Sequence, residues 1–169
     1  MTLQDRQGRP FRVRELCRET DRETVAGFYD AFEPKRAAQG LPPEGAFRIS
    51  RWLDNILRDG THLLVEEADG AVVGHAFLVP TDRPEVAEYA IFLDHGIRGR
   101  GVGTQVNHVA ADVARSIGVR SLWLSVEPHN RAAVRSYEKA GFRFLPGTIY
   151  SPEAEMQLAL EEEPVPAPL

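Results

Sequence analysis

The stretch "DHGIRGRGVGTQ", residues Asp94 to Gln105, places three glycines within five positions. The segment before it, "EYAIFL", is typical of a strand, and the segment after it, "TQVNHVAADVARSIG", is typical of a helix. Glycines at such a junction let a ligand approach the bare main chain, and the N-terminus of a helix attracts phosphate. The stretch therefore predicts a phosphate-binding turn. A tight turn that only needs positive φ angles is the alternative.

Three phosphate-binding designs use glycines in this way, and their spacing separates them. A Walker loop needs lysine and then serine or threonine after its last glycine, which "GVGTQ" does not supply. A dinucleotide fingerprint spaces its glycines G-x-G-x-x-G, whereas Gly99, Gly101 and Gly103 are spaced G-x-G-x-G. The third pattern, Q/R-x-x-G-x-G/A, fits throughout, with Arg98 as its first residue.

A second motif follows later in the chain. The segment "LSVEPHNRAAVRSYEKAGFRF", Leu124 to Phe144, combines a strand, Asn130, a tyrosine seven residues further on at Tyr137, and then Gly-Phe. In this order the two motifs closely resemble the GNAT superfamily of acyl-CoA-dependent N-acetyltransferases. The order of predicted elements agrees from Phe11 to about Leu160, so the resemblance covers most of the chain.

The resemblance implies a role for each motif. The glycine turn would hold the pyrophosphate of coenzyme A on its main-chain amides, and an amide at a strand bulge near Leu93 would polarise the thioester carbonyl. Asn130 would bind the pantetheine or phosphate arm, and Tyr137 would be the general acid that protonates the leaving thiolate. The cofactor-binding residues implied in this way are Ile91, Phe92, Leu93, Arg98, Gly99, Arg100, Gly101, Val102, Gly103, Thr104 and Asn130.

The same residues have plainer interpretations. Seven residues are two helical turns, so Asn130 and Tyr137 share one helix face, about 10 Å apart along the axis. Asn130 stands where a helix N-cap is expected. Tyr137 fits the apolar side of an amphipathic helix, with its hydroxyl on some acceptor.

Glu88, on the strand before the glycine turn, is the candidate general base. Acidic residues on this strand serve that role in several members of the superfamily, and an acceptor ammonium must lose a proton before it attacks. A solvated carboxylate at a strand end is the other interpretation of Glu88, and Glu85 and Asp94 are secondary candidates. The five histidines show no metal-ligand spacing, so we expect no metal.

Hydrophobic periodicity predicts the order strand, two helices, three strands, helix, strand, helix, two strands. With the resemblance, this order indicates an α/β fold of the GNAT type, a mixed, mostly antiparallel central sheet of about seven strands flanked by four helices. The sequence "TDRE", Thr20 to Glu23, predicts a capping box at the first helix. We expect one N-acetyltransferase domain over residues 1–160 and a disordered, acidic, proline-rich tail over residues 161–169.

The composition limits the cellular compartment and the classes of partner that we expect. A net charge of −5 argues against nucleic acid and leaves room for a cationic substrate. The longest charge-free apolar run, "AVVGHAFLVP", is too short to span a membrane. Cys17 is the only cysteine, and the N-terminal segment lacks an apolar signal region, so we expect a cytoplasmic protein. The preference for arginine over lysine suggests a bacterium with a GC-rich genome.

The acceptor is expected to be an amine on a small molecule or on a protein, and the resemblance also allows a homodimer. We place the acceptor site on the two early helices and their linker, about residues 32–52. Three classes of function stand at this point. They are an N-acetyltransferase using acetyl-CoA and direct attack by the amine, a non-catalytic acyl-CoA-binding module of the same fold, and a nucleotide hydrolase, which the missing lysine disfavours.

Overall fold

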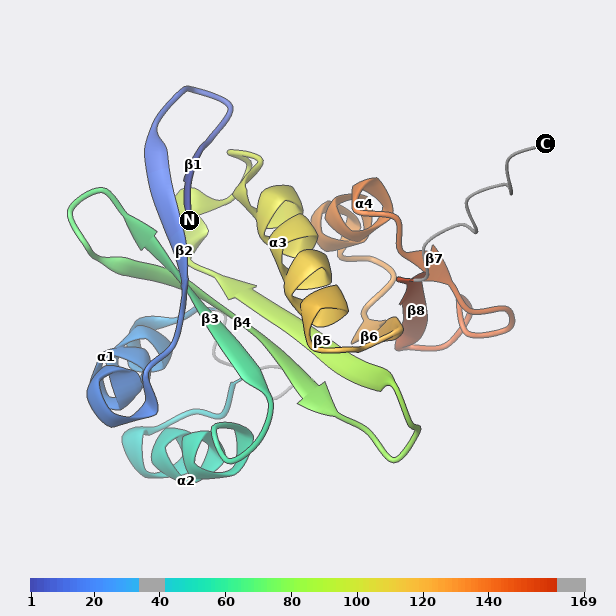
Figure 1. Ribbon diagram of the computed structural model, residues 1–169, viewed down its shortest axis with the longest axis horizontal. Helices are drawn as coiled ribbons and strands as arrows, with labels where there is room; N and C mark the ends of the chain where they lie inside the picture. The colour runs from blue at the N-terminus through green and yellow to red at the C-terminus, as the bar shows by residue number, and fades with distance from the viewer. Residues whose placement is uncertain (34–41, 161–169) are drawn as a thin grey trace.

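The computed structural model describes residues 1–33 and 42–160, and these residues form an open sheet with helices on both faces (Figure 1). The strands of the described residues lie in the order β1-β2-β3-β4-β5-β6-β8-β7. Neighbouring strands are antiparallel except β5 and β6, which are parallel. The strands are β1 (Thr2–Gln4), β2 (Pro10–Glu15), β3 (Thr61–Glu67), β4 (Val72–Pro80), β5 (Val86–Leu93), β6 (Ser121–Val126), β7 (Arg143–Phe144) and β8 (Ala154–Ala159).

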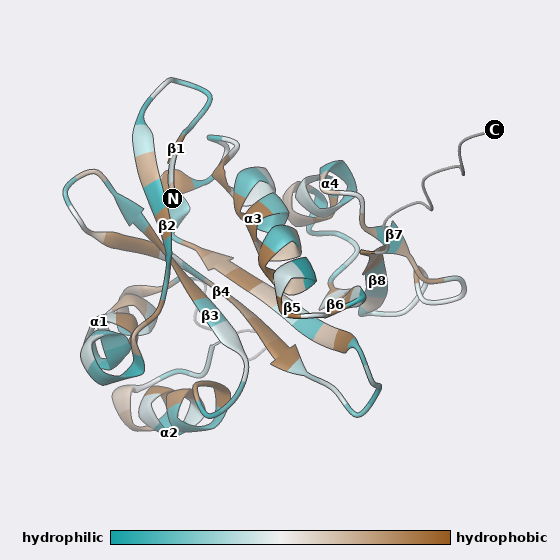
Figure 2. Ribbon diagram, in the orientation of Figure 1, coloured by the Kyte–Doolittle hydropathy of each residue, from teal (hydrophilic) through white to brown (hydrophobic). Residues whose placement is uncertain are grey.

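Two pairs of helices cover the sheet. The helices are α1 (Arg18–Ala31), α2 (Ala46–Ile56), α3 (Val102–Ser116) and α4 (Arg131–Lys139). Side chains alternate along a strand, so β5 contributes Phe92 to the cluster packed under α1 and α2, and Tyr89 to the cluster packed under α3 and α4. Figure 2 shows hydrophobic residues along the central strands and hydrophilic ones on the outward side of α3.

The expected α/β fold of the GNAT type is confirmed, with one strand more than predicted. The extra strand is β1, in an N-terminal segment that we expected to be only polar. Its one large buried-facing residue, Leu3, pairs with Phe11 of β2. Because three residues with one apolar side chain carry no periodicity, the sequence pattern did not indicate this strand.

The capping box predicted at Thr20 to Glu23 is wrong. Helix α1 begins three residues earlier than this box implies, with Cys17 at the N-cap and no side chain capping it. Asp21 instead accepts a hydrogen bond from the Cys17 amide and pairs with Arg14 of β2. The carboxylate therefore joins the helix start to the sheet.

Two predictions lie wholly or partly outside the described residues. The expected tail, 161–169, is outside them. The linker predicted to build part of the acceptor site is outside them at residues 34–41.

Candidate active site

The parallel pair β5–β6 is joined only at its beginning. Val86–Glu88 pairs with Ser121–Trp123, and the register between the two strands ends there. β5 then continues to Leu93 beside β4, while β6 continues to Val126 beside β8. The sheet is therefore split beyond Glu88, and the free edge of β5 runs toward the turn that leads into α3 (Figure 1).

The main-chain amides of Ile91 and Leu93 face this split. Two hydrogen bonds, from the Asp94 amide to the Val73 carbonyl (2.8 Å) and from the Thr81 amide to the Val86 carbonyl (3.3 Å), fix which groups of β5 face β4. Hydrogen-bonded pairs alternate in an antiparallel ladder, so the even-numbered residues of β5 are bonded to β4 and the odd-numbered ones face away.

One expectation for β5 needs correction, and one residue of the expected cofactor site has its main chain directed toward β4. The bulge implied near Leu93 is absent, because β5 pairs with β4 without a register shift from Ala87 to Leu93. Phe92, expected among the cofactor-binding residues, turns its main chain toward β4, and its ring is buried in the α1–α2 cluster. What exposes the amides of Ile91 and Leu93 is the divergence of β6, not a bulge.

The glycine turn presents a run of unpaired amides. Gly99 and Gly101 have φ angles of +73° and +80°, and Gly101 is the N-cap of α3. The first amide of the helix to find a protein acceptor is that of Gln105, which donates to the Gly101 carbonyl over 3.5 Å. Among the described residues no acceptor is found for the amides from Gly99 to Thr104. Such a cradle suits an anion.

The third glycine of the turn is a packing junction. A Cβ at Gly103 would lie 3.2 Å from the Ser136 hydroxyl oxygen of α4 and 3.3 Å from a methyl group of Leu93. The absence of a side chain therefore lets α3, α4 and the end of β5 meet at one point. This contact brings the unpaired amides of the turn close to the amide of Leu93. It also brings α4 near them, and Tyr137 follows Ser136 on that helix.

The two arginines of the turn hold it in place with their side chains. Arg98 donates to the carbonyls of Leu93 (3.0 Å) and Glu33 (3.2 Å), and its guanidinium lies 5.6 Å from the centre of the Phe32 ring. Arg100 pairs with Asp5 (2.6 Å) and Glu67 (2.7 Å), which raises its pKa.

The guanidinium groups of Arg98 and Arg100 are thus committed to protein acceptors. What this turn can offer a ligand is its main chain.

Tyr137 is buried between α4 and the sheet. Its ring packs on Phe142 (5.6 Å between ring centres) and Tyr89 (6.5 Å), and burial raises the pKa of its hydroxyl. No hydrogen-bond partner for this hydroxyl is found among the described residues. It is therefore a protonated phenol that a ligand could use as a donor.

A buried polar network fixes α4 against α3 beside Tyr137. The Tyr89 hydroxyl donates to Asn107 (2.8 Å), and Asn107 donates to Ser136 (3.1 Å). Thr104, in the first turn of α3, lies 3.4 Å from the same Ser136 hydroxyl. Because each of these groups is satisfied by another element, the network sets how α4 sits over the glycine turn.

Asn130 forms the N-cap of α4. Its side-chain oxygen accepts a hydrogen bond from the Ala133 amide at 3.3 Å, and the residue is exposed. The capping interpretation therefore describes what Asn130 does within the protein. Its amide nitrogen has no acceptor among the described residues.

Glu88 opens onto a cavity of about 660 Å³ on the α2 side of the sheet. Partial burial of its carboxyl raises its pKa, and no ion-pair partner for it is found within residues 1–33 and 42–160. The lining residues are Trp52, Asn55, Ile56, Asp59, Phe77, Val79, Pro80, Glu88, Ala90 and Phe92. The wall is apolar and aromatic, with two carboxylate-bearing residues and no lysine or arginine.

Only part of the region expected to build an acceptor site contributes to this cavity. Trp52 lines it, whereas Phe32 is buried in the core and Phe47 is 73% exposed. Asn55 and Asp59, at the end of α2 and beyond it, were not expected. They lie past the stretch 32–52, and only the packing of α2 on the sheet places them at the cavity.

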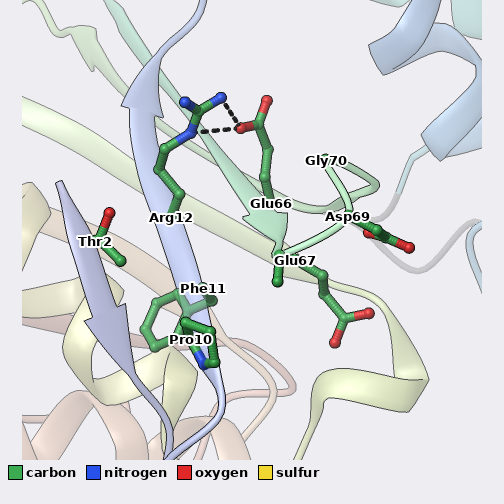
Figure 3. Close-up of a pocket in the computed structure, with 9 residues that line it drawn as sticks. Thr2, Pro10, Phe11, Arg12, Glu66, Glu67, Asp69 and Gly70 are labelled. Carbon is green, nitrogen blue, oxygen red and sulfur yellow. Dashed lines mark hydrogen bonds and ion pairs between the residues drawn. The ribbon is translucent and has the colours of Figure 1, made fainter.

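A second hollow, of about 390 Å³, lies between β1, β2 and the β3–β4 turn (Figure 3). Three of its charged side chains are paired within the protein, and the fourth, Asp69, accepts a hydrogen bond from the Ala71 amide. Glu66 accepts hydrogen bonds from Arg12 and Arg14, and Glu67 pairs with Arg100. Figure 3 shows Arg12 and Glu66 pointing toward each other. We assign no function to this hollow.

The sequence also gave no sign of a buried chain formed by two histidines on the α1–α2 side. The Tyr29 hydroxyl lies 2.6 Å from Nδ1 of His75, His75 Nε2 lies 3.0 Å from Nδ1 of His62, and His62 Nε2 lies 3.0 Å from the Asp59 carbonyl. A carbonyl only accepts, so His62 carries its proton on Nε2 and accepts on Nδ1. His75 then donates through Nε2 and accepts from Tyr29.

Both histidines are therefore neutral. Burial lowers the pKa of each, to about 3 for His75. A proton added to either ring would place a positive charge in the core, which burial disfavours.

Neither a metal cluster nor a membrane-spanning helix is found in the part of the chain that the structure describes. No group of three or more histidine, cysteine, aspartate or glutamate side chains there could hold a metal ion. No helix within residues 1–33 and 42–160 is long and apolar enough to cross a membrane.

Known sequences are similar to parts of this chain. A mycothiol acetyltransferase from Sanguibacter keddieii is 36% identical over 90 residues, which are 50% of this chain but only 29% of the relative. A putative phosphinothricin acetyltransferase from Bacillus subtilis is 27% identical over 135 residues, 75% of this chain and 81% of the relative. The chain thus spans less than a third of the first relative and most of the second.

Solved structures share the fold. The GNAT domain of S. lividans PAT superposes with a TM-score of 0.77 at 20% identity, covering 94% of this chain and 96% of that domain. A putative acetyltransferase from Salmonella typhimurium, solved with acetyl-CoA, superposes with a TM-score of 0.70 at 21% identity, covering 92% and 97%. Residues 20–142 match the sequence model of the acetyltransferase (GNAT) family, a span that includes the glycine turn and Tyr137. The resemblance is thereby confirmed, and the chain belongs to the acetyltransferase (GNAT) family.

Proposed function

We propose that this protein transfers the acetyl group of acetyl-CoA directly to a primary amine, with Tyr137 as general acid and Glu88 as general base. The observation that carries the proposal is the run of unpaired amides from Gly99 to Thr104, next to the split between β5 and β6. Both features offer main-chain donors to a ligand that is extended and carries phosphate at one end.

The described residues fit coenzyme A. The amides of the glycine turn would hold the pyrophosphate, and the free edge of β5 would hold the pantetheine arm in the place of a strand. Acetyl-CoA, when bound, supplies an acetyl group activated as a thioester. The amides of Ile91 and Leu93 are the donors available to polarise its carbonyl, and Arg98 donates to the carbonyl of Leu93. Phe92 has no part in this role.

The amine would bind in the cavity that Glu88 lines. Apolar and aromatic walls suit the carbon skeleton of an acceptor, and Glu88 and Asp59 suit its ammonium group. Glycine turn and cavity lie on opposite faces of the sheet, and the split beyond Glu88 is where the two faces meet. An amine and a thioester would therefore meet at the end of β5, and much of the rate would come from this positioning.

Two protons leave the acceptor ammonium when it becomes an amide. Glu88 would take the first, because a carboxylate with a raised pKa is a better base than an ordinary one. Tyr137 would give its proton to the departing sulfur and recover one as the amide nitrogen loses its second. Burial keeps the Tyr137 hydroxyl protonated until that step.

The setting of the reaction is also part of the proposal. We infer a cytoplasmic enzyme acting on a small-molecule amine, because the cavity is a hollow of about 660 Å³ lined by side chains of α2, β4 and β5 and because the chain carries a single cysteine.

An acetyl-CoA-dependent thiol-release assay across amine classes tests the proposal. Release of free CoA with at least one amine, matched by acetylated product, is the expected result. Tight binding of acetyl-CoA without release in the presence of any amine would favour the non-catalytic acyl-CoA-binding module instead.

A further inference from the structure

The N-terminal hairpin lies against the glycine turn. It consists of β1, β2 and the turn between them, Asp5–Arg9, and it precedes the span that matches the acetyltransferase family, residues 20–142. Figure 1 shows the tip of this hairpin beside the turn that leads into α3. No motif of the family implied a role for it.

Three hydrogen bonds fasten the hairpin to the turn. The Arg6 amide donates to the Arg100 carbonyl (3.0 Å), and the Arg100 guanidinium donates to the Asp5 carboxylate (2.6 Å). One helical turn further on, Gln105 donates to the Gln4 carbonyl (2.8 Å). The contact therefore includes both the main chain of the turn and the first turn of α3.

Asp5 makes the tip of the hairpin rigid. Its buried carboxylate also accepts from the amides of Gln7 (2.8 Å) and Arg9 (2.9 Å) and from the Arg9 side chain (3.0 Å). Burial alone would raise the pKa of Asp5, but these donors and Arg100 lower it well below its usual value. Residue 6 is thus held between fixed neighbours.

The side chain of Arg6 lies alongside Gly101, the N-cap of α3. A Cβ at Gly101 would be only 3.0 Å from both Cγ and Nε of Arg6. The residue is exposed, and no acceptor for its guanidinium is found among the described residues. The neighbouring arginines differ in this respect, since Arg9, Arg98 and Arg100 all donate to protein oxygens.

We propose that Arg6 binds the pyrophosphate of coenzyme A, so that the N-terminal hairpin supplies a side-chain ligand to an anion site otherwise built from main-chain amides. This inference rests on the proposed function, which places the pyrophosphate on the glycine turn. A guanidinium pairs with phosphate oxygens through two parallel N–H groups, and such charge-assisted bonds are about twice as strong as neutral ones. It also offsets the repulsion between a phosphate and a chain of net charge −5.

Isothermal titration calorimetry with three ligands tests the proposal. The ligands are CoA, dephospho-CoA, which lacks the 3′-phosphate, and pantetheine, which lacks every phosphate. Arg6→Gln should weaken CoA and dephospho-CoA by the same factor, about 10-fold, because each loses one charge-assisted contact. Pantetheine should bind both proteins equally. The affinity of the variant for CoA should also depend less on salt concentration.

Two further variants complete the design. Arg6→Lys should recover part of the lost affinity, because lysine keeps the charge but not the two-pronged geometry. Arg83→Gln removes the same charge from the β4–β5 turn, at the far end of β5, and should change no affinity. The thermal unfolding temperature of each variant, compared with that of the wild type, checks that the variant is folded.

Several outcomes would overturn the proposal. If Arg6→Gln binds CoA as the wild type does, while the wild type still prefers CoA to pantetheine, Arg6 is not a ligand and the phosphate site stands without it. A loss confined to CoA would move Arg6 to the 3′-phosphate. A wild type that binds pantetheine as tightly as CoA would overturn the phosphate site itself.

Discussion

The two faces of the sheet both bury polar side chains, but they use them differently. On the α3–α4 face, Tyr89, Asn107 and Ser136 form a network that ends at the glycine turn. On the α1–α2 face, Tyr29, His75 and His62 form a hydrogen-bonded chain that ends on the carbonyl of Asp59. Asp59 is also one of the residues that line the cavity.

The two faces differ in which hydrogen-bonding groups they leave free for a ligand. The network of the α3–α4 face leaves the Tyr137 hydroxyl and the amides of the turn without protein partners, so that face can serve a ligand. The hydrogen-bonded chain of the α1–α2 face satisfies each of its members, and burial disfavours a proton on either of its histidines. We infer that Tyr137 on the first face carries out the proton transfer to the departing sulfur. The histidines of the second face hold its structure and take no part in the proton transfer that we assign to Glu88.

Removing one hydroxyl from each face is the sharpest way to test this contrast. Tyr137→Phe should lower kcat by about 10²- to 10⁴-fold, the usual cost of losing a positioned general acid. The loss should fall on kcat more than on KM, since the proton moves only as the sulfur departs. Steady-state kinetics at saturating acetyl-CoA with an identified amine measures it.

Tyr29→Phe is the matched control, because it removes the same atom from a buried tyrosine on the other face. It should lower stability and leave kcat within about threefold of the wild type. A kcat for Tyr137→Phe within twofold of the wild type, at unchanged affinity for CoA, would show that Tyr137 only packs.

The second comparison is between the two carboxylates at the start of β5. Glu88→Gln should lower kcat by about 10²-fold, because it removes a base from the cavity wall. A base works only when deprotonated, and burial raises the pKa of Glu88, so the acid limb of the wild-type profile should lie above the ordinary value of 4.5. The variant should lose this limb, with the largest deficit at pH values just above it.

Glu85→Gln is the control for charge. Glu85 is exposed and lies 3.5 Å from Arg120, outside the cavity. An unaltered pH profile in Glu88→Gln, or an equal loss in both variants, would return Glu88 to the interpretation of a solvated carboxylate.

The third comparison uses the two ends of α3, each with a glycine at positive φ. Gly101, with φ of +80°, stands at the N-terminal end beside Arg6, and Gly118, with φ of +82°, stands just past the C-terminal end in open space. Alanine at either position should cost about 1 kcal/mol of stability through backbone strain. Only Gly101→Ala should weaken CoA binding, by about 10-fold, because the amides it displaces are the phosphate donors. Calorimetry that finds equal CoA affinity in both variants would contradict this placement.

The sequence was informative where the determinants are local. Glycines at a strand-to-helix junction indicated the turn, and the spacing of Asn130 and Tyr137 indicated α4, because both patterns lie within a few residues. It was uninformative where strands must first pair. His62 and His75 meet because Leu64 pairs with His75 and His62 with Phe77, a register that appears only in the assembled hairpin.

The hairpin tip was missed for a related reason. Strand β1 is stabilised by the carboxylate of Asp5 and by a contact with Arg100, which follows it by 95 residues. Hydrophobic periodicity cannot report such a contact. The split that exposes Ile91 and Leu93 was also beyond the sequence, because it depends on β6 diverging from β5.

The smallest effect should be on stability, and it concerns the histidines of the α1–α2 face. In the folded protein His75 has a pKa of about 3, against 6.5 for an unperturbed histidine, and His62 is lowered as well. Between these values the unfolded chain binds protons that the folded chain does not, so stability is full above pH 6.5 and falls as the pH falls. The expected slope from His75 is about 1.4 kcal/mol per pH unit, and His62 adds to it in the same direction.

Urea unfolding at pH values from 7 to 5 isolates this contribution. The carboxylates with lowered pKa values, Asp5, Asp21 and Glu66, lose their stabilisation only below their ordinary values of 3.8 to 4.5, outside this range. His75→Gln should be less stable at pH 7, because Tyr29 loses its acceptor, yet it should show a shallower decline with falling pH. His129→Gln, at an exposed position, should keep the wild-type slope. Equal slopes in all three proteins would mean that the buried histidines take up protons in the folded state, and the α1–α2 face would then be as open to proton exchange as the face that carries Tyr137.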